Sequence, residues 1–286
     1  MPTTEAPHPL DRLDALLNRF SVRAERVHTG DFCAVRRFPA VPGRGFLHIL
    51  RAGSLTVSDG TGAAPRVLSE ATLLFYPRPH EHAFRAEAGD GVLLDCAALD
   101  FDGGSAHPLV AALPEVVTVP VAGVSGLDGA LALLGEEVAD PRCGHRHVID
   151  RLFEIVLLKL LRHLLDRPEQ YGIPSGLLGG LADPEIARAL VAMHERPGEP
   201  WTLDELGRTA RMSRSAFAAR FREAVGAAPY DYLIDWRLTV GQQLLRRGVP
   251  VAQVAAELGY TSSSFSRVFT QRQGEPPRAW AERSRR

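Results

Sequence analysis

Hydrophobic and polar residues alternate in short runs over residues 22–120, and Gly, Pro and Asp interrupt these runs repeatedly. The clearest runs lie at residues 46–50, 54–57, 71–76 and 91–99. Alternation with a period of two is typical of strands that bury one face. Many short strands at regular spacing predict a β-sandwich or β-barrel in this part of the chain.

The pattern changes to helical periodicity at residues 126–139 and again at 146–166. The second stretch is apolar on more than one face, so a helix here must be buried, either inside its own domain or against a second chain. We expect residues 126–167 to form helices that hold a homodimer together. The Pro- and Gly-rich stretch that follows predicts a linker at residues 168–182.

Helical periodicity resumes at Asp183, which suits an N-cap and precedes a first-turn proline. Within this last part the sequence repeats itself with a period of 48 residues, without a gap over about thirty residues. Phe217 aligns with Phe265, and Phe221 aligns with Phe269. A repeat of this length predicts two copies of one supersecondary unit.

Each copy has the features of a helix-turn-helix. A short helix ends in a turn, and Ser213 or Thr261 then caps a second helix, which the two phenylalanines four residues apart pin to its neighbours. In such units the second helix lies in the major groove of DNA. The helix predicted between the copies, at residues 230–247, can hold the two units about 34 Å apart, on successive major grooves.

The stretch from Trp201 to Trp280 resembles the DNA-binding domain of the AraC/XylS transcription regulators. The elements that carry the resemblance are Ala210-x-Met212-Ser213, Phe217-x-x-x-Phe221, Tyr232-Leu233, Arg237-Leu238, Leu244-Leu245, Gly259-Tyr260, Phe265-Ser266-Arg267-x-Phe269 and Gly274-x-Pro276-Pro277. Three departures from that family stand out. Gly207 and Gly241 replace the usual alanine, Ala219 replaces a more polar residue, and the second turn, before Phe265, looks one residue shorter than usual.

Residues 10–120 look like the cupin sensory domain that often precedes this DNA-binding domain. The resemblance implies an α+β chain with a cupin-like β-barrel at residues 1–125, the helical dimerisation segment, the linker, and an all-α domain of two helix-turn-helix units joined by a long helix at 183–286. It implies a cytoplasmic transcription regulator whose partners are promoter DNA, a small-molecule effector or oxidant, and RNA polymerase. It implies no enzyme activity and no cofactor, and it leaves activation and repression open.

The distribution of charge agrees with a nucleic-acid partner. Residues 201–286 contain 14 Arg, no Lys and 8 acidic residues, a net charge of +6, whereas the rest of the chain has 19 basic and 26 acidic residues, a net charge of −7. A basic half beside an acidic half indicates a polyanion partner for the C-terminal part only. The sequence has no apolar stretch long enough for a membrane span, and its three cysteines are too few for a disulfide scaffold.

Helical geometry selects the candidate DNA contacts, because the phenylalanines occupy the buried face. Arg267 is the candidate for direct readout, since arginine paired with guanine is the commonest specific base contact. Four other arginines are candidates for phosphate contacts, which set the register on the duplex: Arg214, Arg220, Arg222 and Arg272. The smaller residues on the exposed faces complete the set: Ser215, Ala219, Ser262, Ser263 and Ser264.

The candidate sensory residues are three histidines and one cysteine. His80 and His82 share one face of a strand, and His48 lies in an earlier strand, so these imidazoles could hold a divalent metal. Cys96 could be a redox sensor or simply a buried residue. Two other functions stay open: a metal-dependent cupin enzyme with a DNA-binding appendage, and a constitutive DNA-binding module whose barrel only dimerises.

Overall fold

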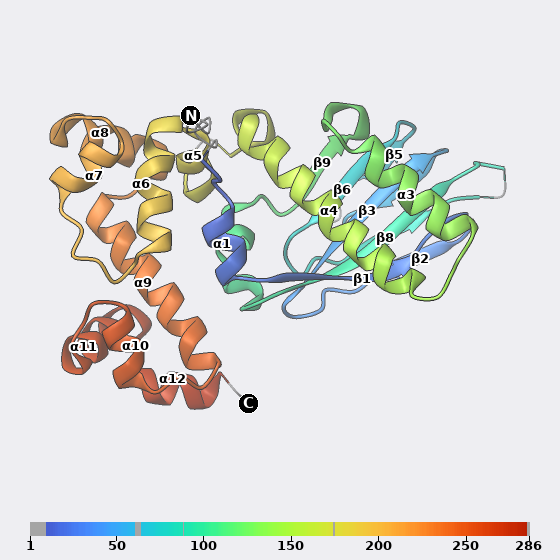
Figure 1. Cartoon of the computed structure of the whole chain (residues 1–286). Coiled ribbons are helices and arrows are strands. Elements are labelled where there is room, and N and C mark those ends of the chain that lie inside the picture. Colours follow the sequence, from blue (N-terminus) through green and yellow to red (C-terminus); the bar gives the residue numbers. More distant parts are fainter. Residues whose placement is uncertain (1–9, 61–63, 88, 174, 285–286) are drawn as a thin grey trace, which may run out of the picture. The chain divides into compact units, whose positions relative to one another are not determined.

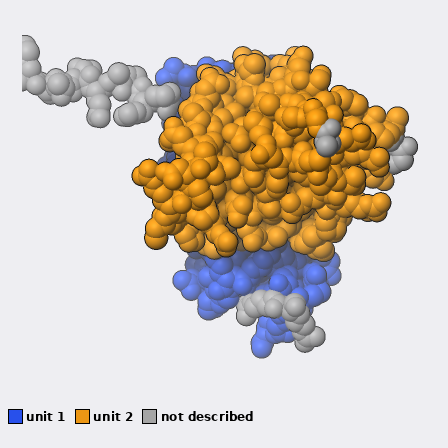
Figure 2. All heavy atoms as spheres, turned by 90° about the vertical axis from the view of Figure 1, so that its right-hand side faces the viewer, with its two compact units in different colours: residues 1–19, 174–286 blue, residues 20–173 orange. Residues whose placement is uncertain are grey.

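The computed structural model describes residues 10–60, 64–87, 89–173 and 175–284. The chain divides into two compact units (Figures 1 and 2). Residues 20–173 form one of them, here called the sheet unit, and residues 1–19 together with 174–286 form the other, here called the helical unit. Among the described residues, no helix combines the length and the apolar character that crossing a membrane requires.

The sheet unit consists of antiparallel strands in two sheets (Figure 1). The strands are β1 (Val22–His28), β2 (Val35–Phe38), β3 (Arg44–Ala52), β4 (Leu55–Ser58), β5 (Arg66–Leu68), β6 (Thr72–Tyr76), β7 (His82–Arg85), β8 (Leu93–Phe101) and β9 (Val117–Pro120). The larger sheet has the order β1-β8-β3-β6-β9, and the smaller has the order β2-β7-β4-β5. The four predicted strands correspond to β3, β4, β6 and β8, and the prediction of a β-rich N-terminal part is therefore confirmed.

The core of the sheet unit lies between the two sheets. Phe38 and Phe84 from the smaller sheet pack with Leu74, Tyr76 and Leu94 from the larger one, and all five are buried. The alternation read from the sequence produces this arrangement, because every second side chain of a strand points to the same face. Apolar residues of both sheets thus meet in one cluster.

Two helices, α3 (Asp128–Ala139) and α4 (His145–Asp166), cover the outer face of the larger sheet, and α4 packs along β1 and α3 (Figure 1). The buried apolar residues of α4 therefore pack inside their own unit. The sequence allowed these residues to pack either inside their own domain or against a partner chain, and most of them are buried inside the domain. The unit also contains a short helix α2 (Pro108–Ala112) and three 3₁₀ turns among its described residues: Gly104–Ala106, Val121–Gly123 and Glu169–Tyr171.

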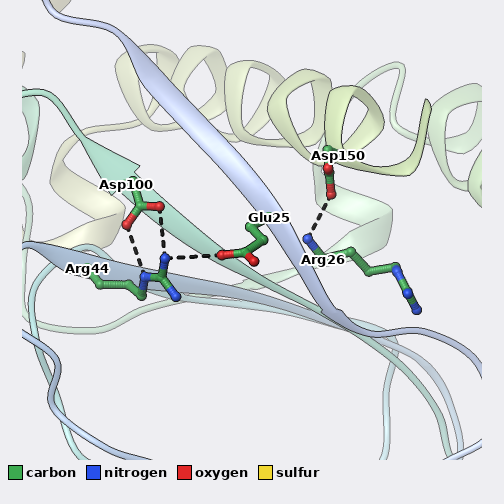
Figure 3. A network of polar contacts seen from close by, with 5 residues as sticks. All are labelled: Glu25, Arg26, Arg44, Asp100 and Asp150. Carbon is green, nitrogen blue, oxygen red and sulfur yellow. Dashed lines mark hydrogen bonds and ion pairs between the residues drawn. The ribbon is translucent and has the colours of Figure 1, made fainter. Parts of the chain in front are cut away.

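Carboxylates of α4 accept hydrogen bonds from backbone N–H groups on the unpaired edge of β1. Asp150 accepts a hydrogen bond from the backbone N–H of Arg26 at 2.8 Å (Figure 3), and Glu154 accepts one from the backbone N–H of Ala24 at 3.2 Å. Unpaired N–H groups on an edge strand invite pairing with another chain, and a covering helix removes that risk. Nearby, Arg44 bridges Asp100 of β8 and Glu25 of β1 across the sheet (Figure 3).

The helical unit contains the first helix of the chain and all helices after residue 174. The helices are α1 (Asp14–Arg19), α5 (Leu177–Ala182), α6 (Pro184–Glu195), α7 (Leu203–Thr209), α8 (Arg214–Val225), α9 (Pro229–Arg246), α10 (Val251–Glu257), α11 (Ser262–Gln273) and α12 (Pro277–Arg283). Asp183 caps α6 through the N–H groups of Glu185 and Ile186, as the sequence predicted. The predicted helical C-terminal part is confirmed.

Two boundaries differ from the expectation. The stretch expected as a linker at 168–182 contains the 3₁₀ turn Glu169–Tyr171 and the helix α5, because Leu178 and Leu181 of α5 are buried against α6 and α8. The N-terminal helix α1, expected within the first domain, packs on α6. Arg12 donates to the carbonyl of Leu181 at 3.2 Å, which ties the start of the chain to the helical unit.

The 48-residue repeat extends to the ends of the helices. The bounds of α7 and α8 shifted by 48 residues coincide with those of α10 and α11. Ser213 and Thr261 accept hydrogen bonds from the third N–H group of α8 and α11, and Gly226 and Gly274 end these helices in the left-handed region at φ 77° and 79°. Both helix-turn-helix copies therefore have turns of the same length, and the second turn is not shorter than the first.

The middle of each turn adopts a positive φ, yet one turn has arginine and the other glycine. Arg211 has φ 56° and Gly259 has φ 75°. A side chain at Gly259 would place its Cβ 2.2 Å from the carbonyl oxygen of Gly198, which no side chain can tolerate. Glycine is therefore required at this turn by packing as well as by conformation. At Gly241 the fit is close but less restrictive, since an added Cβ would lie 3.1 Å from the ring of Phe265.

Candidate functional site

The helices α8 and α11 turn the same pattern of side chains outward. Phe217 and Phe221 of α8, and Phe265 and Phe269 of α11, are fully buried and fix the orientation of each helix. Of the ten candidate DNA contacts, Ser264 is half-buried and nine are exposed: Arg214, Ser215, Ala219, Arg220, Arg222, Ser262, Ser263, Arg267 and Arg272. The structure thus presents the candidates as two surfaces, one on each second helix.

On α8 the face opposite the phenylalanines is centred on Ala219, with Ser215 one turn before it. One turn after it lies Glu223, an exposed residue that the sequence analysis did not select. Glutamate on a reading helix can accept a hydrogen bond from the amino group of cytosine. The position could have been found by extending the 100° rotation per residue by one more turn.

On α11 the equivalent face is centred on Arg267, which aligns with Ala219 in the repeat. Gln271 lies one turn further on, aligns with Glu223, and was likewise missed. Glutamine can pair with both hydrogen-bonding groups of adenine. The serines before Arg267 lie beside the helix cap, because the hydroxyls of Ser263 and Ser264 are 3.2 and 2.5 Å from that of the capping residue Thr261.

The candidate arginines differ in their neighbours. Arg220 forms ion pairs with Asp183 at 2.7 Å and Glu223 at 2.9 Å, and Arg214 lies 3.7 Å from Asp204. Arg272 lies within 3.4 Å of two further carboxylates, those of Asp231 and Asp235. These pairs are partly or largely exposed and therefore weak, so DNA phosphates can compete with them.

Arg222 and Arg267 stand apart from these three. Within the ranges that the structure describes, neither guanidinium lies within 4.0 Å of a carboxylate. An arginine without an intramolecular partner needs no ion pair broken before it binds a base or a phosphate. Both side chains are therefore available for contact with DNA without the loss of an ion pair.

In the sheet unit, the structure brings two of the candidate histidines together. His48 of β3 and His82 of β7 are buried, and their Nε2 atoms are 2.8 Å apart. The Nδ1 of His82 lies 2.9 Å from the carbonyl oxygen of His80, which can only accept, so this nitrogen carries the proton. The Nε2 of neutral His82 is then the acceptor, and the Nε2–H of His48 is the donor.

Burial keeps this pair neutral. Burial lowers the pKa of His82 to about 4 and lowers the pKa of His48 well below its usual range, and mutual repulsion with His82 lowers that of His48 further. Neutral imidazole is the form of histidine that binds a metal ion, so the protonation state of this pair would allow metal binding. However, His80 faces the carbonyl oxygen of Asp59 at 3.0 Å instead of joining them.

The metal-ligand set is therefore small. Over the described part of the chain, no three His, Cys, Asp or Glu side chains converge on a point where an ion could bind. Catalytic metal sites in proteins use about three protein ligands. The pair His48–His82 falls short of that set, and the alternative of a metal-dependent enzyme gains no support from this geometry.

Cys96 lies in the same core as His48, its cross-strand neighbour on β3. It is fully buried, and burial raises the pKa of its thiol well above its usual range. The thiolate is the reactive form of cysteine, so this environment disfavours oxidation. Burial as a small core residue explains Cys96.

Acid should destabilise the sheet unit through the histidine pair. Between the usual histidine pKa near 6.5 and the value of about 4 for His82, the unfolded chain binds a proton that the folded chain does not, so stability falls as pH falls. For His82 alone, we expect the free energy of unfolding to drop by about 2 kcal/mol between pH 7 and pH 5. Urea unfolding at both values measures this drop, and His82→Gln should reduce it, whereas exposed His147→Gln should not. An equal drop in all three proteins would contradict the assignment.

Comparisons with known proteins match both parts of the chain. A family model described as Cupin matches residues 11–166, and one described as Helix-turn-helix domain matches residues 206–283. A putative AraC-like transcription regulator of Streptomyces antibioticus is 34% identical over 236 residues, which cover 79% of this chain and 76% of the relative. The HTH-type transcriptional regulator AlkR of Acinetobacter baylyi is 28% identical over 274 residues, covering 83% and 87%.

Among solved structures, the DNA-binding domain of AdpA in complex with a target DNA is 30% identical, covers 35% of this chain and 91% of that chain, and has a TM-score of 0.34. The sequence matches to the cupin model and to the regulators extend over most of the chain. This chain belongs to the AraC-like transcription regulators, with a cupin-type N-terminal domain and a DNA-binding helix-turn-helix domain at its C-terminal end.

Proposed function

We propose that this transcription regulator reads one face of its promoter DNA with α8 and α11, each placed in one of two successive major grooves. The observation that carries the proposal is the coincidence of the two units after a shift of 48 residues, with the same caps and the same buried phenylalanines. Between them lies α9, an 18-residue helix, which is about 27 Å long. One helix of this length can set the spacing of the two reading helices.

Selection of binding sites from a randomised duplex library tests this function with the full-length chain. We expect enrichment of a bipartite motif whose two parts are centred about 10–10.5 base pairs apart, one helical turn of DNA. The absence of any enriched sequence at moderate salt would contradict the proposal. A single short motif would contradict the use of both helices.

Arg222 is proposed to bind a phosphate, so its loss should not change sequence preference. We expect Arg222→Ala to weaken binding to selected and random duplexes by a similar factor and to lower the salt slope of the binding constant by about one. Titrations at several salt concentrations measure the slope. Exposed Arg146→Ala in the sheet unit is the control and should leave the slope unchanged, and a loss confined to the selected duplex would assign Arg222 to base readout.

We also propose that α3 and α4 pair two chains through the apolar residues that remain exposed on them. Leu133, Val148 and Ile155 are 52%, 41% and 42% exposed, although they are large and apolar. Sedimentation should therefore show a dimer at micromolar concentration. Val148→Glu with Ile155→Glu should yield a monomer, whereas Val67→Glu, at an exposed valine of β5, should remain a dimer. A wild-type monomer would contradict the proposal.

The sheet unit is proposed to be the sensor for a small molecule. The proposal is supported by the match of this unit to a cupin model, which lies in the same chain as the match to a helix-turn-helix domain. A sensory unit is useful to a regulator when binding of a ligand changes the state of that unit. The position of a ligand site is taken up below.

A further inference from the structure

The outer face of the smaller sheet contains a hollow of about 570 Å³. Alternation along the strands separates the residues of this face from those of the core, so that Phe84 and Val57 point inward while their neighbours in the chain point outward. This volume lies within the range of about 300–1,000 Å³ typical of small-molecule sites. Residues of β2, β4 and β7 line it.

Strand register defines the side chains of the hollow. One row across the sheet runs from Val35 through Arg85 to Thr56, and the next runs from Arg37 through Ala83 to Ser58. Arg37 and Arg85 thus stand on neighbouring strands, where Ala83 is the cross-strand partner of Arg37 and Val35 is that of Arg85. The small side chain of Ala83 and both arginines line the hollow, and Thr56 and Ser58 on the adjoining strand add two hydroxyls to the lining.

The charge of the hollow is not neutralised within the described residues. Both arginines are exposed, and in the part of the chain described by the structure neither lies within 4.0 Å of a carboxylate. Glu81 is the acidic residue among those that line the hollow. Two positive charges that face a shared space favour an anionic group that both can contact.

Protection of the sheet edge explains only one of these arginines. Charged residues on an edge strand prevent pairing with other chains, and β2, which carries Arg37, is an edge strand. Arg85 lies on β7, between β2 and β4, where no edge needs protection. At the two ends of its row, Val35 and Val67 are 59% and 64% exposed and offer an apolar surface next to the charges.

We propose that this hollow binds a small molecule with an anionic head, a carboxylate or a phosphate, and an apolar body. The head lies between Arg37 and Arg85, within reach of the hydroxyls of Thr56 and Ser58, and the apolar body lies along Val35. The proposal rests on the proposed sensory role of the sheet unit and gives that role a place and a ligand class. It places the ligand on the outer face of the smaller sheet, in a hollow whose lining also includes His82 and Phe84 of β7.

Binding of three eight-carbon probes to the full-length chain tests the site by calorimetry. Octanoate and octyl phosphate carry the two anionic heads, and octanol carries none. We expect at least one of the two anions to bind measurably more tightly than octanol, and the stronger of them identifies the head. Equal binding of octanol and the anions, or no binding of either anion at millimolar concentration, would overturn the proposal.

Variants then locate the bound probe. Arg37→Gln and Arg85→Gln should each weaken binding of the anion about tenfold, because one charge-assisted contact is lost. Ala83→Leu should abolish binding, because the larger side chain occupies the space beside the arginines while both charges remain. Arg146→Gln, at an exposed arginine of the same unit, should change the affinity less than twofold. Unchanged affinity in the first three variants would overturn the site.

Selection of DNA sites by the same proteins separates this proposal from the proposed function. If the chain selects a DNA sequence but binds neither anion, the site fails and the regulator stands. If it binds an anion at Arg37 and Arg85 but selects no sequence, the site stands and the reading of DNA fails.

Discussion

Replacing Phe265 with alanine should lower the free energy of unfolding of the helical unit by about 3–5 kcal/mol, the cost of emptying a large buried site. Phe265 is fully buried and contacts the rings of Tyr260 and Phe269, with ring centres 6.2 and 5.5 Å apart. The close fit at Gly241 shows that the site is tightly filled. The surrounding helices therefore cannot collapse fully into the space that the ring leaves.

Tryptophan fluorescence measures this effect in the helical unit alone, because the three tryptophans of the chain are Trp201, Trp236 and Trp280. Urea unfolding of Phe265→Ala should show a lower midpoint. The neighbouring change Ser266→Ala should lower the free energy of unfolding by less than about 1 kcal/mol. A loss below about 1 kcal/mol for Phe265→Ala would show that this ring does not anchor α11.

The second large effect concerns the reading of bases by α11. Arg267→Ala should weaken binding to the selected sequence by about 1–3 kcal/mol and relax the preference at one or two base pairs. The physical reason is the exposed, unpaired position of Arg267 at the centre of the outer face, where the first unit has Ala219. Site selection with the variant measures the change directly.

The repeat supplies a matched test of the same idea. Ala219→Arg places an arginine at the equivalent position of α8 and should add a preference for guanine in the other part of the motif. The surface change Arg278→Ala on α12 should alter neither preference. Selection of an unchanged motif by Arg267→Ala would contradict the assignment of direct readout to this residue.

Local signals in the sequence determined the two helix-turn-helix copies and the residues that cap their second helices. The caps Ser213 and Thr261, and the phenylalanines four residues apart, act within one or two helical turns, so their effect can be read from neighbouring positions. The same rotation rule predicted nine candidate contacts that are exposed, and one more turn would have added Glu223 and Gln271. Strand alternation likewise predicted the β-rich half, although it did not predict which strands pair.

Only the tertiary structure decided the features that depend on contacts between distant residues. The N-terminal helix α1 joins the helical unit because it packs on α6. The stretch at 177–182 is a helix because α6 and α8 cover its leucines, although its glycines suggested a linker. His48 and His82 meet because the two sheets pack face to face, and Arg37 and Arg85 flank one hollow because strand register places them on neighbouring strands. Strand register and packing depend on the summed contacts of the whole unit, so they cannot be inferred from any short stretch of the sequence.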